Sequence, residues 1–411
     1  MEKYILDNGL KVIQYKIKNF NSLFIALNIK VGSRYETEEY AGMAHFLEHM
    51  IFKGTKKYPT SFDLIRTVDK MGANYNAYTS NENTCYHFNL SKNYLYNILE
   101  IIKEMIFYSK FEEKEIKSEI NVVLEELKKR SDNPNYYLQT KEMELIFGKN
   151  SLGRSVGGYE KVIKKFNRKK ILNFYNQYYN TNNMGLIIVG DLPTGLKPKI
   201  KTLFDIKLKK YPITINGYKD FIVTQNKNRK KIYDNKNNQT RLVLGFPFNI
   251  KADSKDLYII SLLSNILGGN MSSILFRELR DKLGLCYTIG TDIDIFNNTS
   301  VFYIHTGTQK KNITKIIKEI YKIIKGLKKN GFSKKDFDDG KNNYINKYFV
   351  NIDSVSSIGG YYIDELKISN FKKIENHNKY IDDIKKIKLS DVNKYITKIF
   401  DFNKLNLVIL N

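Results

Sequence analysis

Two stretches of this chain resemble each other, and this internal repeat constrains the fold more than any other feature of the sequence. RTVDKMGANYNAYTS, which contains Gly72, parallels RELRDKLGLCYTIGT, which contains Gly284, and a Tyr follows each Gly at the same distance. A second pair, FEEKEI from Phe111 and FSKKDF from Phe332, opens a long helical pattern in each half. A weak two-fold repeat of this kind is typical of a duplicated domain.

The length of the chain agrees with a duplication. At 411 residues it is too long for one ordinary core and suits two domains of about 200 residues each. We predict an N-terminal domain over residues 1–205 and a C-terminal domain over residues 206–411. Strand-like runs separated by long helical patterns occur in both halves, at residues 24–29, 85–90, 185–189, 240–246 and 301–306. This order predicts an α+β class, in which each domain has a mainly antiparallel sheet with helices packed on one face.

The first half contains the motif His45-Phe46-Leu47-Glu48-His49. On a helix, His45 and His49 lie on the same face one turn apart, so both rings can reach one metal ion. Glu48 lies close to that ion and stays free to act on a water molecule, whose pKa zinc lowers to about 7. Incidental histidines on a surface helix are the alternative explanation, because a motif match is only a hypothesis.

A catalytic zinc usually has three protein ligands and one open position, so a third ligand is expected elsewhere. Residues 111–130 form an amphipathic helical pattern with Glu119 and Glu126 at the edge of its apolar stripe and Glu125 on its solvent side. We therefore predict Glu126 as the third ligand and Glu119 as a carboxylate that orients the site. A solvated charge is the default for any single Glu on such a helix.

With these residues in place, the sequence resembles the M16 (pitrilysin/insulinase) family of zinc peptidases. H-x-x-E-H is the inverzincin signature, and AGMAHFLEHMIFKGT is similar to the metal-binding helix of the family. EINVVLEEL, from Glu119 to Leu127, is similar to the family motif that supplies the third ligand. Other similar segments are LDNGLKVI, MGANYNAYTSNENTCYHF, YYNTNNMGLIIVGDL and GGNMSSILFRELRDKLGLCYTIG. The resemblance implies the LuxS/MPP-like metallohydrolase fold in a short two-domain form, like bacterial homologues of the mitochondrial processing peptidase beta subunit.

The resemblance also implies residues that bind substrate. Arg280 and Tyr287 match family positions from which the later domain contacts the substrate, Tyr287 by a hydrogen bond to the oxyanion. Asn76 and Ala77 match an edge strand to which an extended peptide adds. The alternatives are a surface Arg and a strand Tyr without a ligand, and a polar hairpin edge.

The second copy of the repeat lacks the predicted site. When Gly72 is aligned with Gly284, the residues opposite the metal motif are Leu257, Ile260 and Ser261; when Phe111 is aligned with Phe332, Lys347 falls opposite Glu126. Only the first half is therefore built for metal chemistry.

Charge and cysteine content bear on partners and location. The net charge of +25 suggests nucleic-acid binding as an alternative function. However, the basic residues are scattered along the chain, and no nucleic-acid-binding motif accompanies them. We therefore expect no nucleic-acid partner. The N-terminus shows no signal or transit pattern, and no apolar run is long enough to span a membrane. Cys85 and Cys286 are interpreted as small buried hydrophobes, which suits a reducing compartment. We expect a cytoplasmic protein.

The sequence thus leads to one main hypothesis and one alternative. The first is an endopeptidase with one Zn²⁺ per chain, with Glu48 as general base, acting on peptides or unfolded protein segments in an enclosed chamber. The family suggests a homodimer, in which we expect Arg280 and Tyr287 to face the zinc of the partner subunit. A heterodimer with an inactive homologue is the alternative assembly. The alternative is a non-catalytic partner subunit, although such subunits usually lose the ligands. Ligand type alone does not separate zinc from manganese or cobalt.

Overall fold

The structure, a computed structural model, describes residues 1–206, 220–225, 227–234, 239–250, 255–369 and 374–411. The chain divides into two compact units, each assembled from three segments. Unit 1 contains the described residues of Met1–Lys129, Arg154–Lys219 and Ile352–Ile374. Unit 2 contains those of Arg130–Gly153, Asp220–Asn351 and Glu375–Asn411.

Sheet 1, in unit 1, has the strand order β1-β2-β6-β3-β5-β4. Its strands are β1 (Glu2–Ile5), β2 (Lys11–Lys16), β3 (Ser22–Ile29), β4 (Asn74–Thr79), β5 (Thr84–Ser91) and β6 (Met184–Gly190). β2 and β6 pair in parallel, and the other neighbours pair antiparallel. β4 is therefore an edge strand, with one side of its backbone turned away from the sheet.

Alternating residues of sheet 1 face two different layers of helices. Leu23, Ile25 and Leu27 of β3 belong to the larger core, which the helices after β3 and after β5 complete. These helices are α1 (Met43–Met50), α2 (Ser61–Asp69), α3 (Leu95–Phe107), α4 (Glu113–Ser131), α6 (Glu160–Ile163), α7 (Arg168–Tyr178) and α8 (Leu196–Phe204). Phe24 and Ala26 point to the opposite face and pack against α12 (Val355–Ile368). The period of two along β3 thus assigns each side chain to one layer.

Sheet 2, in unit 2, has the strand order β7-β11-β8-β10-β9. Its strands are β7 (Arg229–Tyr233), β8 (Thr240–Phe248), β9 (Cys286–Ile295), β10 (Ser300–Thr308) and β11 (Asn406–Leu410). The longer helices of unit 2 are α5 (Pro134–Phe147), α9 (Asp256–Gly268), η6 (Phe276–Lys282), α10 (Ile313–Asn330), α11 (Lys334–Asn351), α13 (His377–Lys386) and α14 (Leu389–Ile399). β11 and β7 pair in parallel, and the other neighbours pair antiparallel.

The two units repeat one topology. In chain order, β7, β8, α9, η6, β9, β10, α10 and α11 follow the same sequence as β2, β3, α1, α2, β4, β5, α3 and α4. The strand order β7-β11-β8-β10-β9 also reproduces β2-β6-β3-β5-β4. α9 is therefore the equivalent of α1, and α11 the equivalent of α4.

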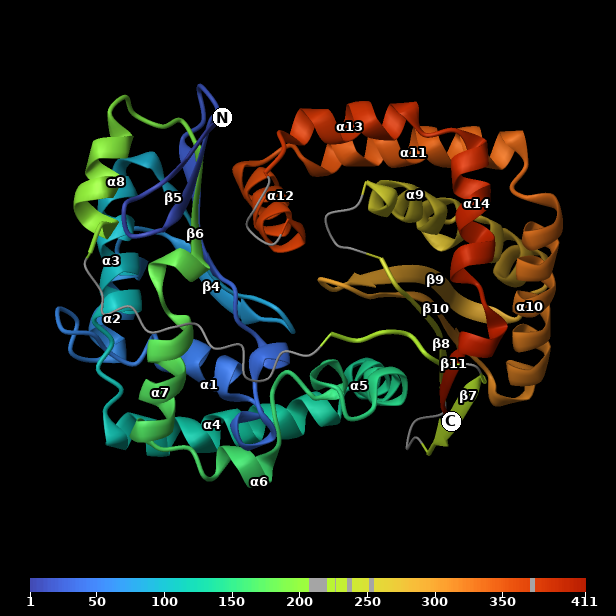
Figure 1. The fold of residues 1–411 in the computed structure, drawn as a ribbon, viewed down its shortest axis with the longest axis horizontal. Coiled ribbons are helices and arrows are strands. Elements are labelled where there is room, and N and C mark those ends of the chain that lie inside the picture. The colour runs from blue at the N-terminus through green and yellow to red at the C-terminus, as the bar shows by residue number, and fades with distance from the viewer. Residues whose placement is uncertain (207–219, 226, 235–238, 251–254, 370–373) are drawn as a thin grey trace. The chain divides into compact units, whose positions relative to one another are not determined.

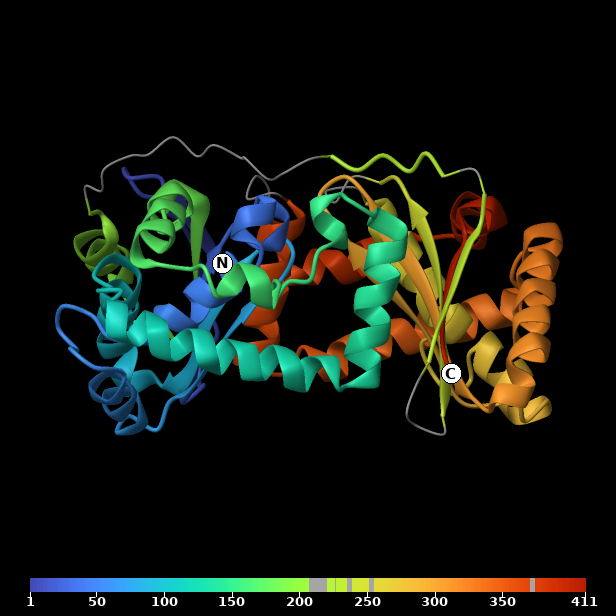
Figure 2. The same cartoon turned by 90° about the horizontal axis from the view of Figure 1, so that it is seen from below.

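Each unit takes one helix from the other half of the sequence. α12, which follows α11 in the chain, packs on the face of sheet 1 that α1 does not cover. α5, which follows α4, packs in the same way on sheet 2, where Leu138 contacts Val408 and Leu410; Figures 1 and 2 show α5 against these strands. The predicted division after residue 205 would put α5 with the N-terminal domain and α12 with the C-terminal domain. In the structure, α5 belongs to unit 2 and α12 to unit 1.

The α+β prediction with two homologous domains is confirmed, and the five predicted strand runs lie in β3, β5, β6, β8 and β10. Helices were expected on one face of each sheet, and the structure adds one exchanged helix to the other face. Cys85 and Cys286 are buried, as predicted. In the part of the chain that the structure describes, no helix is long and apolar enough to cross a lipid bilayer.

Candidate metal centre

α1 carries the motif residues and is almost entirely buried. The helix starts after Gly42, whose φ of 94° favours glycine. The Glu36 carboxylate accepts hydrogen bonds from the backbone N–H groups of Gly42 and Ala44, each at 2.8 Å. Burial raises the pKa of Glu36 to about 8, although these backbone hydrogen bonds act to lower it. Glu36 therefore fixes the start of the helix that presents His45 and His49, and sequence reasoning did not identify it.

His45, His49 and Glu126 converge as predicted. Glu126 Oε2 lies 3.7 Å from His45 Nε2 and 3.3 Å from His49 Nε2, and one donor atom from each of the three residues lies within 4.8 Å of the others. Donors around a tetrahedral zinc with bonds of about 2.0–2.1 Å are about 3.3 Å apart, so this donor set fits the ion. Within the described part of the chain, no other group of three His, Cys, Asp or Glu donors converges in this way.

Glu119 lies behind His49. It belongs to α4, as Glu126 does, and both carboxyl groups project from the same side of that helix. Glu119 Oε1 is 2.8 Å from His49 Nδ1, and Glu119 Oε2 pairs with Lys53 Nζ. When Nδ1 donates its proton to Glu119, the lone pair of Nε2 faces Glu126 and the metal position. This arrangement of a carboxylate behind a metal-binding histidine orients the ring and increases its basicity.

The carboxylates control the protonation of His49. Burial by itself lowers the pKa of His49, but the hydrogen bonds with Glu119 and Glu126 outweigh it and raise this pKa to about 9. Burial would raise the pKa of Glu119, yet its bonds with His49 and Lys53 hold it below the ordinary value. A metal cation competes with the proton on His49, because imidazole binds metals in its neutral form.

Glu48 occupies the same turn of α1 as His49 and is 8% exposed. Its Oε2 accepts a hydrogen bond of 2.6 Å from the Thr79 hydroxyl on β4. Sequence reasoning missed Thr79. In the structure, exposed and half-buried residues alternate along β4, and Ala77 and Thr79 lie on the same face.

Asn76 and Ala77 lie in the edge strand β4, paired with His87 and Tyr86 of β5. The backbone N–H of Ala77 donates to the side-chain oxygen of Asn76 at 2.9 Å. A carbonyl group of a strand added at this edge would have to replace the Asn76 side chain as the acceptor of this N–H group.

Arg280 and Tyr287 lie in unit 2. Arg280 belongs to η6, and its guanidinium lies over the Phe276 ring at 4.7 Å from the centroid. Tyr287 is in β9 at a β-bulge, because Gly307 pairs with Thr288 and the next residue of β10 pairs with Cys286. A bulge re-aims a side chain, and the Tyr287 hydroxyl donates to Gln239 at 3.0 Å.

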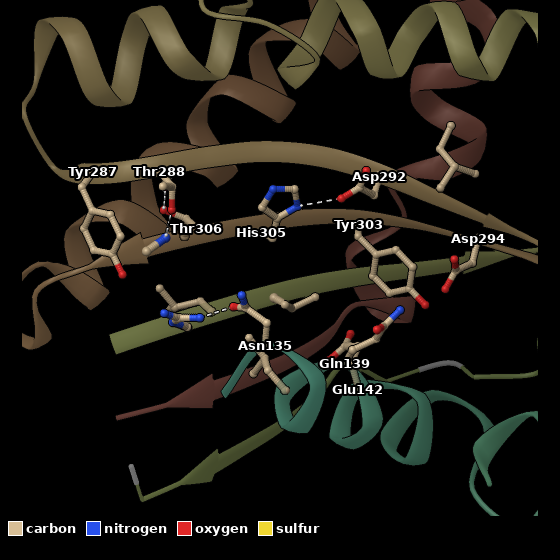
Figure 3. A pocket seen from close by; sticks show the side chains of 16 residues that line it. Asn135, Gln139, Glu142, Tyr287, Thr288, Asp292, Asp294, Tyr303, His305 and Thr306 are labelled. Atoms are coloured by element: carbon tan, nitrogen blue, oxygen red, sulfur yellow. Dashed lines mark hydrogen bonds and ion pairs between the residues drawn. The ribbon is translucent and has the colours of Figure 1, made fainter. Parts of the chain in front are cut away.

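Tyr287 also lines a cavity of about 620 Å³ between α5 and the strands of sheet 2. Figure 3 shows Tyr287, Tyr303 and His305 on the strands, with Glu142 reaching up from α5. On this wall, Nδ1 of His305 lies 3.2 Å from a carboxylate oxygen of Asp292. Sequence reasoning did not identify the cavity, because α5 comes from the other half of the chain.

Known proteins resemble the chain in both halves. Residues 12–159 match the family model described as insulinase (peptidase family M16), and residues 165–344 match the model described as peptidase M16 inactive domain. A Rickettsia bellii protein named as an uncharacterized zinc protease is 34% identical over 328 residues, which cover 78% of this chain and 77% of that protein. The uncharacterized zinc protease YmxG of Bacillus subtilis is 28% identical over 87% of this chain and 86% of its own length.

A solved structure also resembles this chain in its fold. A protease from Helicobacter pylori superposes with a TM-score of 0.91 at 25% identity, covering 100% of this chain and 99% of that one. The metal-donor geometry of unit 1 accompanies this similarity in sequence and fold. The chain belongs to the insulinase family of peptidases, family M16.

Proposed function

We propose that the protein is a zinc-dependent endopeptidase that hydrolyses peptide bonds in unstructured peptides. The observation that carries this proposal is the convergence of His45, His49 and Glu126 with the Glu48 carboxyl group on the same turn of α1. Three protein donors leave the open fourth position that catalytic zinc sites have. Relatives named as zinc proteases support the same activity.

The residues divide the work. His45 Nε2, His49 Nε2 and a Glu126 carboxylate oxygen hold the metal, and Glu119 holds the His49 ring in the required tautomer. Zinc, when bound, supplies Lewis-acid chemistry that acidifies a water molecule and polarises the scissile carbonyl. Glu48 takes the proton from the attacking water and delivers it to the leaving amine nitrogen, as a general base and then a general acid.

We propose that the substrate is an extended segment, because β4 is an edge strand beside Glu48. Main-chain groups of β4, the strand that contains Asn76 and Ala77, can bond to a peptide that adds as another strand. At the Ala77 N–H, the peptide would replace the Asn76 side chain. Recognition through the main chain tolerates many sequences but requires a segment without secondary structure of its own. Unfolded protein segments and free peptides meet this requirement.

Arg280 and Tyr287 are proposed to bind the same substrate, with Tyr287 bonding the oxyanion of the intermediate. The family suggests a dimer in which these residues serve either their own subunit or the partner. Mixing Glu48→Gln subunits with Arg280→Ala subunits tests this point. Activity recovered in the mixture supports action across subunits, and no recovery supports action within one subunit.

The direct test is cleavage of a quenched fluorogenic peptide library by the purified protein, with its metal content measured. We expect cleavage that a chelator abolishes and that about one equivalent of zinc per chain restores, consistent with one set of three protein donors and an open fourth position. Parallel additions of manganese and cobalt identify the preferred ion. A protein that binds zinc in this site but cuts no peptide in the library is a partner subunit, and the peptidase proposal is then wrong.

A further inference from the structure

The Thr79 hydroxyl is committed to Glu48. Thr79 Oγ1 lies 2.6 Å from Glu48 Oε2 and 3.4 Å from Thr84 Oγ1. Thr84 donates its own proton to the Val31 carbonyl at 2.8 Å. In the bond between Thr79 and Glu48, the Thr79 hydroxyl is the donor and Oε2 of Glu48 is the acceptor.

This hydrogen bond restricts a flexible side chain at the place where its direction matters. A hydroxyl bonded to a carboxylate at 2.5–2.7 Å is a charge-assisted, strong hydrogen bond, and the bond observed here falls in that range. Glu48 is 8% exposed, so little water competes for Oε2. The Thr79 hydroxyl therefore fixes Oε2, and with it the plane of the Glu48 carboxyl group.

In the second copy of the repeat, the aligned threonine also bonds a helix, but it does not bond the residue aligned with Glu48. Aligning Gly72 with Gly284 places Thr79 opposite Thr291. Thr291 of β9 also bonds α9, but one turn beyond Ile260, the residue opposite Glu48. It donates to the Ser264 carbonyl at 2.8 Å and accepts from the Ser264 hydroxyl at 2.9 Å. In unit 2 the threonine meets a serine, whereas in unit 1 it meets the proposed base.

We propose that Thr79 is a positioning residue that holds the Glu48 carboxylate in the orientation needed for proton transfer. This inference rests on the proposed peptidase function. Because Thr79 lies two residues after Ala77 on the same edge strand, it also ties the orientation of the base to the strand on which the substrate would add.

Kinetics with three variants test the role. Thr79→Val keeps the shape of the side chain and removes the hydroxyl, and we expect kcat to fall by at least about tenfold, since misplacing a catalytic group by about 1 Å can cost 100-fold. KM should stay within about twofold, because no substrate-binding group is lost. Thr79→Ser restores the hydroxyl and should recover most of kcat. Thr291→Val, the matched control in unit 2, should lower Tm without lowering kcat.

Each result is decisive. A Thr79→Val protein with wild-type kcat, a Thr79→Ser protein as slow as Thr79→Val, or an equal loss in Thr291→Val overturns the positioning role. If the wild-type protein itself cuts no peptide, the peptidase proposal fails instead. Crystal structures of zinc-loaded wild type and Thr79→Val then still test the inference: we expect the Glu48 carboxylate to move away in the variant, and an unmoved carboxylate contradicts it.

Discussion

Unit 1 and unit 2 share a topology but differ at the positions that carry chemistry. α1 presents His45, Glu48 and His49, whereas the aligned residues of α9 are Leu257, Ile260 and Ser261. Leu257 and Ile260 are buried in the core of unit 2. The same strands and helices therefore form around apolar residues, and the fold does not depend on the polar ones.

The comparison shows what the site costs unit 1. Glu48 and Glu119 are buried carboxyl groups, and burying such groups is unfavourable unless they are paired. Each has a partner in the structure, Thr79 for Glu48 and both His49 and Lys53 for Glu119. In unit 2, the residue aligned with Glu48 is the buried apolar Ile260, which needs no hydrogen-bond partner. The scaffold of unit 2 therefore forms without the motif.

The largest effect should come from removing the proposed base. Glu48→Gln keeps the shape and burial of the side chain but cannot accept the proton, so peptide cleavage should fall by at least about 100-fold with zinc content unchanged. Ile260→Val at the aligned position of α9 should leave cleavage intact and lower Tm slightly. Cleavage by Glu48→Gln at the wild-type rate would remove the distinction between the units.

Loss of the third ligand should empty the site. Glu126→Gln replaces an anionic ligand by a neutral amide, so zinc measured after dialysis should fall from about one per chain to near zero. Lys347→Gln, at the aligned position of α11, should retain the metal. Full zinc occupancy in Glu126→Gln would mean that the metal is bound elsewhere.

The carboxylate behind His49 should have a smaller effect. Glu119→Ala leaves the three ligands but frees the His49 ring, and we expect zinc affinity to fall by about 10–100-fold. Competition with a chromogenic chelator measures the change. Glu125→Ala, an exposed position on the same helix, is the control, and equal affinities for the two variants would contradict the orienting role.

The smallest effect concerns the exchanged helix α12. A Cβ at Gly359 would lie 2.0 Å from the Phe24 ring of β3, so Gly359→Ala should destabilise the protein by about 1–3 kcal/mol. A Cβ at the neighbouring Gly360 meets nothing within 4 Å, and Gly360→Ala should stabilise by up to about 1 kcal/mol. Denaturant unfolding compares the two. Equal effects would contradict the packing of α12 on sheet 1.

Local patterns were enough to predict which side chains converge beside α1. Helical spacing places His45 and His49 on one face of α1, and the apolar stripe of α4 places Glu119 and Glu126 on the side that faces them. The five strand runs were likewise visible as short β-rich segments. These features depend on the spacing of residues within a single helix or strand, and this spacing can be seen in the sequence itself.

The rest depends on contacts between distant segments. No local pattern shows that α12 covers sheet 1 or that α5 covers sheet 2, and the cavity beside Tyr287 requires α5. Thr79 was missed for the same reason, since its role appears only when β4 packs against α1. The bulge that re-aims Tyr287 is a matter of strand register, which single residues do not reveal.

Anomalous diffraction at the zinc edge, from crystals of the purified protein, tests the difference between the units most directly. We predict one zinc peak per chain, bonded to His45, His49 and Glu126, with no peak beside α9. A chain without zinc at these three residues, or with its zinc held by other side chains, would contradict the assignment of the metal centre to unit 1.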